Sequence, residues 1–469
     1  MSPQNPTGAP QIVERALAAA QAHPSHAGTS VIVSEESGVN LRWAANTLTT
    51  NGVTTGQSVA VAAAVRTPAG VSVGVLSRRG VGPDDVAALV EDAQRVAAAS
   101  PPAEDAADLV SGGASETWEQ PAEATGPEVL ATFAEGLGEA MREARSGDRE
   151  LFGFAHHEVR TSWLGTTAGT RRRHVQPQGS VQLTGKSDGR SRSTYVGQAT
   201  RDFADVDVAR LAADVEQRLG WQRRRVNLDA GRYDTVLPPS AVADLLVYAY
   251  WSSDARGAHE GRTAFSRRGG GTRVGERLTD VPLTLRSDPA EPGLECEPFV
   301  LTAGSSPFAS VFDNGMPVPA TTWVDAGVLA ALPTTRFTSG LTGLPLHPAA
   351  DNLVVTGDGG SGSVEDLVRG LDRGLLVTCL WYIREVDPTT LLLTGLTRDG
   401  VYLVEDGEVT GAVTNFRFNE SPVDMLRRVE AVGSTVPALS REWGDYFPRT
   451  AMPPLRVGGF NMSSTSQAS

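Results

Sequence analysis

The early part of the chain alternates apolar and polar side chains in four short segments, and this period of two constrains the fold more than any other feature. Such alternation predicts strands with one buried face, here at residues 29–34, 39–44, 58–66 and 70–76. Ser37-Gly38, Asn51-Gly52 and Pro68 separate the segments and predict turns. Apolar residues at helical spacing precede and follow them, at 10–22 and after Gly82-Pro83. Residues 1–100 are therefore predicted to form an N-terminal α/β domain.

A stretch rich in Pro, Ala, Glu and Gly follows this domain and predicts a linker over residues 101–127. A middle α+β domain is expected over residues 128–228. It should contain a helix at 127–145, a meander of strands from 151 to 183 and a mobile loop at 185–193. A second helix is predicted near 206–219, with Asp205 or Asp207 as its N-cap.

The remaining residues, 229–469, carry short alternating segments and many Pro turns, which favour a mostly antiparallel β-rich domain with a few helices. One helix should start at Ser240. Ser363-Val364-Glu365-Asp366 predicts a capping box for another helix, which Gly374 should close. Asp406-Gly407 predicts a hairpin between two strands. The fold class expected for the whole chain is α+β.

Bulk charge and composition exclude several classes of function. A net charge of −14 disfavours nucleic-acid binding, because phosphates repel an acidic protein. The arginine clusters at 171–173, 190–192, 223–225 and 267–268 are expected to be solvated faces. Two cysteines, Cys296 and Cys379, are too few for a disulfide framework. With neither a leader-like start nor a long apolar run, the sequence predicts a cytoplasmic protein that spans no membrane.

One short segment begins like the zinc helix of a metallopeptidase. His259-Glu260 would supply one imidazole ligand and a general base, but such a helix needs a second histidine four or five residues after the first. Those positions hold Thr263 and Ala264. His259 and Glu260 are therefore catalytic candidates without a complete metal site. The pair His156-His157 lies in a predicted strand, where neighbouring side chains point to opposite faces and do not converge on one metal.

The order of several short motifs along the whole chain resembles the TldD/PmbA family of metalloprotease-related proteins. The carrying segments are Arg42-Trp43-Ala44-Ala45-Asn46, Arg172-Arg173-His174-Val175, Phe265-Ser266, Gly275-Glu276-Arg277-Leu278, Thr284-Leu285-Arg286-Ser287-Asp288-Pro289, Arg373-Gly374-Leu375-Leu376-Val377-Thr378, Asp387-Pro388, residues 404–411, residues 426–433 and Pro453-Pro454-Leu455-Arg456-Val457.

The resemblance implies two branches that assemble together. The TldD branch carries a helical His-Glu-x-x-x-His and a late cysteine as its zinc site. This chain has Ala264 at the second histidine position and no cysteine after Cys379. It therefore resembles the TldE (PmbA) branch, and we expect it to hold no metal or cofactor of its own, with zinc bound by a TldD-like partner.

The function expected from this resemblance is that of a non-zinc subunit in a cytoplasmic peptidase, which helps form the cleft for short or unfolded peptides. A homodimer without the partner is also compatible with it. Two alternatives remain open from the sequence. One is an independent divergent metal-dependent peptidase that uses His259 and Glu260. The other is a DNA-associated regulator of the gyrase-modulator type, which the negative charge disfavours.

Overall fold

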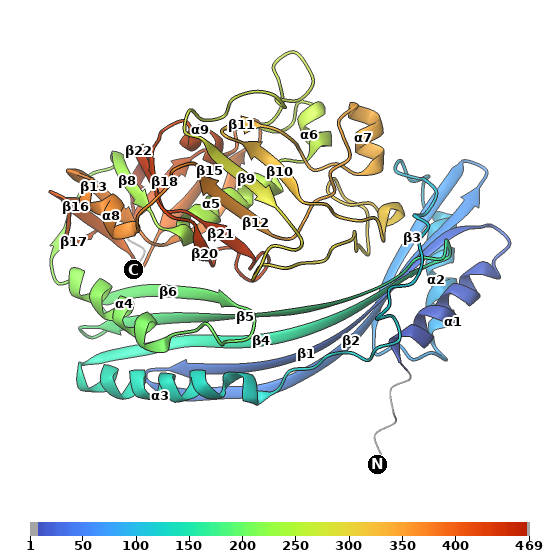
Figure 1. Ribbon diagram of the computed structural model, residues 1–469, viewed down its shortest axis with the longest axis horizontal. Helices are drawn as coiled ribbons and strands as arrows, with labels where there is room; N and C mark the ends of the chain where they lie inside the picture. Colours follow the sequence, from blue (N-terminus) through green and yellow to red (C-terminus); the bar gives the residue numbers. More distant parts are fainter. Residues whose placement is uncertain (1–7, 467–469) are drawn as a thin grey trace.

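The computed structural model describes residues 8–466 and has an α+β fold in which a long curved sheet supports a β-rich C-terminal domain (Figure 1). Helices cover one face of the curved sheet, and the C-terminal domain lies over the other. No helix within residues 8–466 is long and apolar enough to cross a bilayer.

The curved sheet is antiparallel and has the strand order β3-β2-β1-β4-β5-β6. Its strands and the helices around it are α1 (Ala9–Gln21), β1 (His26–Ala44), β2 (Thr47–Thr67), β3 (Gly70–Arg79), α2 (Val86–Ala99), η1 (Pro127–Leu130), α3 (Ala131–Ser146), β4 (Arg149–Thr166), β5 (Arg171–Ser187), β6 (Arg192–Thr200) and α4 (Val208–Trp221).

The strands are longer than the alternation predicts. Two predicted strands merge into β1, which runs through Ser37-Gly38, and Asn51-Gly52 lies inside β2 rather than in a turn. The turn falls instead at Ala45-Asn46, where both residues have positive φ. β1 pairs with β2 on one edge and, from Ser30 to Trp43, with β4 on the other. These hydrogen bonds satisfy the backbone at Ser37-Gly38, so the strand continues where the local sequence predicts a turn.

Burial on the helix-covered face divides into two apolar clusters along the same strands. Toward one end, Val31, Val33 and Trp163 pack with α1 and α2. Toward the other end, Leu41 and Trp43 pack with α3 and α4. Each fully buried apolar side chain of this size contributes about 1.5–3 kcal/mol. The two helix pairs thus fix the register of β1 from both ends.

Strands of the predicted N-terminal and middle units belong to this one sheet, because β1 pairs with β4. The segment predicted as a linker, 101–127, lies against the sheet instead of separating two bodies. Trp118 within it is buried, and its carbonyl accepts a hydrogen bond from the indole of Trp163. The structure therefore contains a single continuous layer where the sequence suggests two.

The predicted loop at 185–193 is also mostly strand. β5 continues to Ser187 and β6 begins at Arg192, and the short turn between them has positive φ at Asp188, Gly189 and Arg190. The predicted helix near 206–219 is α4, and Asp207 is its N-cap, accepting from the backbone N–H of Arg210.

The C-terminal domain contains two further sheets, with strand orders β11-β10-β9-β12-β21-β20 and β14-β15-β18-β22-β8-β13-β16-β17-β7. Its elements are β7 (Arg225–Val226), β8 (Gly231–Leu237), α5 (Pro239–Trp251), α6 (Ala255–His259), β9 (Leu283–Ser287), η2 (Val311–Asp313), β10 (Thr321–Asp325), β11 (Val328–Leu329), α7 (Arg336–Thr342), β12 (Leu353–Gly357), α8 (Val364–Arg369), β13 (Arg373–Val377), β14 (Leu380–Asp387), β15 (Leu392–Thr397), β16 (Val401–Glu405), β17 (Glu408–Val413), β18 (Phe416–Glu420), α9 (Pro422–Leu426), β19 (Val429–Val432), β20 (Val436–Ala438), β21 (Thr450–Met452) and β22 (Leu455–Thr465).

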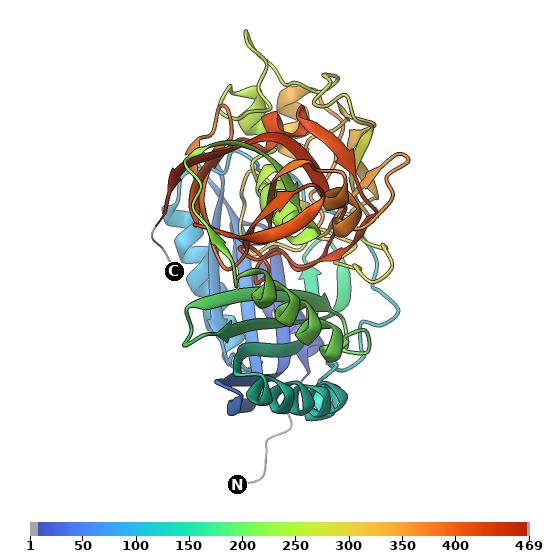
Figure 2. The ribbon, with the colours of Figure 1, turned by 90° about the vertical axis from the view of Figure 1, so that its left-hand side faces the viewer.

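The larger of these sheets curls into a ring in the view of Figure 2. Helix α5 belongs to the core that both sheets share, and its apolar positions Val242, Leu245 and Leu246 are buried as the helical spacing predicts. Because α5 is apolar nearly all round, it has no solvent face and serves as an internal support.

In this domain, predicted caps and turns are confirmed where the interacting residues lie only a few positions apart in the sequence. The capping box at Ser363 and Asp366 is present, and Asp406-Gly407 forms the predicted hairpin turn with positive φ at both residues. The prediction that Gly374 closes the capped helix is wrong. The helix ends at Arg369, and Gly374 lies in β13, because a parallel pairing with β8 recruits that segment.

Candidate functional site

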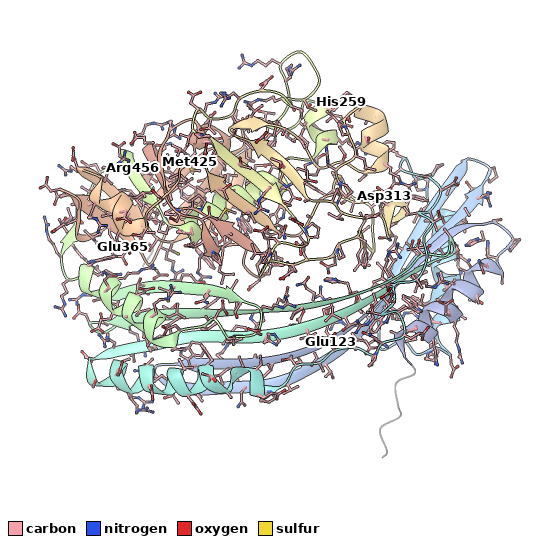
Figure 3. All side chains as sticks on the ribbon, in the orientation of Figure 1. Glu123, His259, Asp313, Glu365, Met425 and Arg456 are labelled. Atoms are coloured by element: carbon pink, nitrogen blue, oxygen red, sulfur yellow. The ribbon has the colours of Figure 1, made fainter. Side chains whose placement is uncertain are left out.

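The His259-Glu260 segment does not have the geometry of a zinc helix. Helix α6 is five residues long and ends at His259, with Glu260 as its C-cap and Gly261 at positive φ. A residue four or five positions beyond His259 therefore lies outside the helix and does not share its face. In Figure 3, His259 lies near the top of the C-terminal domain.

Glu260 is engaged by arginines rather than poised as a base. Its carboxylate accepts a hydrogen bond from Arg256 (2.9 Å) and also pairs with Arg262. The hydrogen bond from Arg256, followed by the charge of Arg262, holds the pKa of Glu260 below its ordinary value. A general base for neutral pH needs a pKa nearer the working pH, so this environment favours an ion-paired role.

The other positions in question are buried. Ala264 packs in the C-terminal core, and its carbonyl accepts from Arg273. Cys379 is buried, and burial raises the pKa of its thiol well above the ordinary value. Within residues 8–466, no three His, Cys, Asp or Glu side chains gather as they would around a metal ion.

The two neighbouring histidines of β4 point to opposite faces of the sheet, as their spacing predicts. On the helix side, His157 bonds through Nδ1 to the Thr125 hydroxyl (2.7 Å) and through Nε2 to the Arg201 carbonyl (2.8 Å). On the other face, His156 contacts the Ser180 hydroxyl. Burial lowers the pKa of both rings, which favours neutral imidazoles in structural roles.

The first arginine cluster ties the 101–127 segment to the sheet. Arg172 donates to the Gly113 carbonyl (2.7 Å), and Arg173 donates to the Pro121 carbonyl (2.6 Å). The Arg173 side chain is only 4% exposed and lies over the Trp163 ring. These arginines are therefore structural, whereas the sequence predicts a solvated face.

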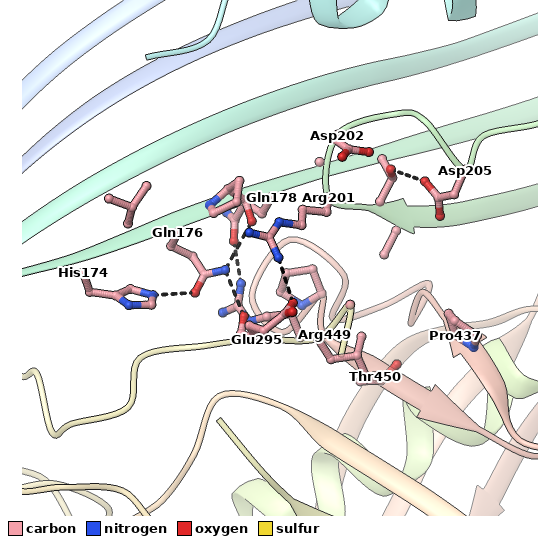
Figure 4. Close-up of a pocket in the computed structure, with 18 residues that line it drawn as sticks. His174, Gln176, Gln178, Arg201, Asp202, Asp205, Glu295, Pro437, Arg449 and Thr450 are labelled. Carbon is pink, nitrogen blue, oxygen red and sulfur yellow. Dashed lines mark hydrogen bonds and ion pairs between the residues drawn. The ribbon is translucent and has the colours of Figure 1, made fainter. Parts of the chain in front are cut away.

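A cleft of about 310 Å³ lies between the curved sheet and the C-terminal domain (Figure 4). From the sheet, its walls come from β5 and from the end of β6 with the loop that follows. The C-terminal domain supplies residues 293–295, Pro437 and residues 448–450. The cleft lies where the two layers meet and brings polar groups from both of them together, so we take it as the candidate functional site.

The polar side chains of the cleft follow from the strand period. His174, Gln176 and Gln178 alternate along β5 and share the face toward the C-terminal domain. Their partners across β4 are Ser162, Arg160 and Glu158. Continuing to β1, the opposite residues include Ser34 and Glu36. We call these eight residues, Ser34, Glu36, Glu158, Arg160, Ser162, His174, Gln176 and Gln178, the polar belt.

Three contacts cross the cleft and set its width. Gln176 Nε2 donates to the Glu295 carbonyl (3.0 Å), and Arg449 donates to Gln178 Oε1 (2.9 Å). Arg201 forms an ion pair with the Glu295 carboxylate (3.1 Å), in which both side chains are about half exposed. An exposed pair of this kind contributes little stability, roughly 0–1 kcal/mol, whereas the side chains of Gln176 and Arg449 are buried.

The charged side chains of the polar belt are two carboxylates that share one guanidinium. Arg160 lies between Glu36 (3.0 Å) and Glu158 (3.4 Å). Burial raises the pKa of Glu158, with Arg160 opposing the shift and Glu36 adding to it. The belt thus offers amides, hydroxyls and paired charges, which suit hydrogen bonds to a polypeptide backbone better than acid–base chemistry.

The sequence alone marks none of these cleft residues as functional. Arg172-Arg173-His174-Val175 carries the family resemblance, yet only the polar alternation at His174, Gln176 and Gln178 could have indicated a polar sheet face. Glu295 and Arg449 come from loops with no local motif. Their roles depend on how distant segments meet.

Comparison with solved structures shows the same fold over nearly the whole chain. TldE from Thermococcus kodakarensis aligns with a TM-score of 0.73 and 15% identity, covering 96% of this chain and 98% of that chain. A protein of Thermotoga maritima described as a candidate modulator of a DNA gyrase gives 0.75 and 16%, covering 96% and 99%. A similarly described protein of Bacteroides thetaiotaomicron gives 0.75 and 13%, covering 97% and 98%.

No curated protein matches the sequence. The family model described as PmbA/TldA metallopeptidase C-terminal domain matches residues 230–464, which is half of the chain. This match covers the β-rich domain from β8 to β22. The resemblance inferred from the motif order is thereby confirmed, and the chain belongs to the TldD/PmbA family.

Proposed function

We propose that this chain is the non-zinc subunit of a cytoplasmic peptidase of the TldD/TldE type, acting on short or unfolded peptides. One observation carries the proposal. Helix α6 ends at His259, and the position where the TldD branch would need its second histidine is Ala264, buried in the core. A methyl group offers no metal bond, and Glu260 is occupied by two arginines. The fold shared with TldE supports the same role.

In this proposal the chain contributes surface rather than a catalytic group. The polar belt and the cleft beside it present hydrogen-bonding side chains along an extended strand face, a shape suited to an unfolded peptide. A zinc-bearing, TldD-like partner would carry out hydrolysis, and this chain would help to hold the substrate next to it. Homodimers without the partner are compatible with this role.

The decisive experiment is to co-express the chain with the protein from the same genome that carries His-Glu-x-x-x-His and a late cysteine. We expect a stable complex on size exclusion, zinc in the partner only, and faster cleavage of an unfolded peptide by the complex than by the partner alone. His259→Ala in this chain should leave the zinc content and the rate unchanged.

Two other outcomes would overturn the proposal. Stoichiometric zinc in the isolated chain, lost together with hydrolysis in His259→Ala, would establish an independent metal-dependent peptidase. No complex and no effect on the partner's rate, with binding to duplex DNA that weakens steeply as salt increases, would instead favour a DNA-associated regulator.

A further inference from the structure

Another concave site lies at the opposite end of β6 from the candidate cleft, and no part of the proposed function uses it. Its volume is about 380 Å³. The curved sheet supplies the turn between β5 and β6, and the C-terminal domain supplies β7, the segment between β15 and β16, and the end of β17. In Figure 1 this is the left-hand end of the molecule, where the start of β6 approaches β17. We call the site the basic pocket, after the four cationic side chains that line it, Lys186, Arg190, Arg225 and Arg398.

The basic pocket concentrates positive charge in a chain whose net charge is −14. Among the described residues that line it, Asp399 is the one carboxylate, and it pairs with Arg398 (3.3 Å). Arg190 is also neutralised, because it donates twice to Glu150 outside the pocket (2.6 and 3.1 Å). Arg190 and Arg225 belong to two of the clusters that the sequence predicts to be solvated faces, and the fold brings them to one pocket.

The other two cations have no carboxylate partner. Within residues 8–466, the Lys186 ammonium forms no hydrogen bond or ion pair, and it lies 5.7 Å from the centroid of the Phe152 ring. Arg225 donates to a backbone carbonyl of the β5–β6 turn and forms no ion pair in the described part of the chain. The pKa of Glu150 is lowered first by its hydrogen bond from Arg190 and less by the charge of Lys186, so Lys186 contacts that carboxylate only at longer range. Two positive charges therefore remain available to an anion.

The walls of the basic pocket also contain hydrogen-bonding groups without partners. The side chains of Asn227 and Thr414 form no hydrogen bond within residues 8–466. The same holds, over the same residues, for the backbone N–H groups of Asp399 and Gly400. Gly400 is buried, and a buried N–H usually has an acceptor. Because Gly400 lines the pocket, a ligand oxygen bound there would supply this acceptor.

These groups suit a phosphate better than a carboxylate. A phosphate monoester carries about 1.5 to 2 negative charges at pH 7 and offers three acceptor oxygens, which match two unpaired cations and the free N–H groups. Guanidinium and ammonium groups are common protein donors to phosphate. A phosphate fills only part of the pocket, and the remaining walls carry hydroxyls, amides and the small apolar side chains of Val226, Ala412 and Val413. The ligand therefore has a small body of mixed polarity.

We propose that the basic pocket binds the phosphate monoester of a small polar molecule, with Lys186 and Arg225 as its charged contacts. The ligand would touch both layers, since Lys186 comes from β5 and Arg225 from β7. It would therefore join the curved sheet to the C-terminal domain at this end of β6. This site goes beyond the proposed function and requires neither a partner subunit nor a peptide, so the isolated chain is sufficient to test it.

A nucleic acid is a poor occupant of the same charges. Its binding depends on positive charge spread along a surface, which neutralises several phosphates at once. The basic pocket offers two unpaired cations in a chain of net charge −14. A small phosphate ester needs no more than these cations and the neighbouring N–H groups. Because an oligonucleotide also carries phosphates, the experiments include one.

The first test is calorimetric titration of the isolated chain, at low ionic strength in a buffer without phosphate. We expect saturable one-to-one binding of ribose 5-phosphate, weaker binding of inorganic phosphate and no binding of ribose. Citrate that binds at least as tightly as ribose 5-phosphate would replace the phosphate by carboxylates and contradict the proposal. An oligothymidylate that binds more tightly, with an affinity that falls steeply as salt increases, would contradict it as well. Absence of binding by both inorganic phosphate and ribose 5-phosphate would overturn the site.

The second test removes one positive charge at a time from the pocket. Lys186→Gln and Arg225→Gln each keep a hydrogen-bonding side chain and should weaken ribose 5-phosphate binding by about tenfold. Arg223→Gln is the matched control, because Arg223 is exposed, lies outside the pocket and loses the same charge. The control should bind within about twofold of the natural chain. Circular dichroism checks folding. Unchanged binding in both folded pocket variants, or an equal loss in the control, would contradict the assignment to this pocket.

Hydrogen exchange on the natural chain avoids any effect of substitution on folding. Saturating ribose 5-phosphate should slow exchange at the amides of Asp399 and Gly400 and leave residues 174–178 of the candidate cleft unchanged. Protection of the cleft with none at Asp399 and Gly400 would place the ligand elsewhere and overturn the inference. Failure of this site would leave the proposed function standing, because complex formation with the zinc-bearing partner is measured separately. Ribose 5-phosphate binding without any partner complex would reject the proposed function and leave the basic pocket assigned.

Discussion

The guanidinium of Arg441 lies over the ring of Tyr195, 4.3 Å from its centroid, and joins the C-terminal domain to the curved sheet. The same guanidinium lies 4.1 Å from the ring centroid of Trp381. This stack is an apolar and electrostatic contact between the two layers on the far side of β6 from α4.

Arg441→Ala should therefore weaken the contact between the layers. Losing two cation–π contacts and the packing of the arginine stem is expected to lower the free energy of unfolding by about 1–3 kcal/mol. Urea unfolding measures this change. Arg268→Ala, at an exposed arginine with no ion pair among residues 8–466, is the matched control and should stay within about 0.5 kcal/mol. Equal effects in the two variants would contradict the role of the stack.

Asp244 should make stability depend on pH. Burial raises the pKa of this fully buried carboxyl to about 7, although Ser440 and the Glu442 N–H donate to it. Because the folded state holds the proton more tightly than the unfolded chain, its contribution to stability is present below about pH 4 and is lost as pH rises toward 7.

The measurement for Asp244 is urea unfolding between these pH values, compared with Asp244→Asn, which cannot titrate. The stability of the natural chain relative to the variant should fall by a few kcal/mol across this range, at about 1.4 kcal/mol for each unit of pKa difference. Parallel curves for the two proteins would show that Asp244 is ionised in the folded state throughout.

Arg173→Ala should release the 101–127 segment from the sheet. The variant loses the bond to the Pro121 carbonyl, the contact with Glu123 and the stacking on Trp163. Limited proteolysis should then cut within this segment at protease concentrations that leave the natural chain intact. Arg79→Ala, at an exposed residue of β3, provides the control. An unchanged digestion pattern would mean that the remaining contacts suffice.

Gly153→Ala should be strongly destabilising for a steric reason. A β-carbon at this position would overlap the ring of Trp43 and the carbonyl of Gln182. Overpacking of this kind costs about 1–3 kcal/mol, which thermal unfolding would detect. Gly113→Ala, where a β-carbon meets nothing within 4 Å, should be nearly neutral. A neutral Gly153→Ala would mean that the Trp43 indole can move aside.

Much of the local structure follows from the sequence because it depends on neighbours within a few residues. The capping box at Ser363, the Asp406-Gly407 turn and the opposite faces of His156 and His157 are of this kind. The merged strand β1 is not. Its continuity through Ser37-Gly38 depends on β4, a strand more than a hundred residues away.

The candidate site could not be predicted from the sequence either, because it too depends on contacts between distant segments. Gln178 and Arg449 meet across 271 residues of chain, and Gln176 meets Glu295 across 119. Neither pair belongs to a local motif, and an amide or a guanidinium alone indicates no chemistry. His259-Glu260 is a local motif and therefore suggests a zinc helix in the sequence. Because α6 ends at His259, the position of a second histidine ligand does not lie on the same helix.

The length of β1 also limits where residues can be inserted into or deleted from the curved sheet. Its odd-numbered residues are buried under one helix pair at its start and another at its end. A single inserted residue would invert every position beyond it and expose one of the two cores. Insertions and deletions are therefore expected at the hairpin tips, such as Ala45-Asn46 and residues 188–191. The number of residues within β1 itself should stay constant.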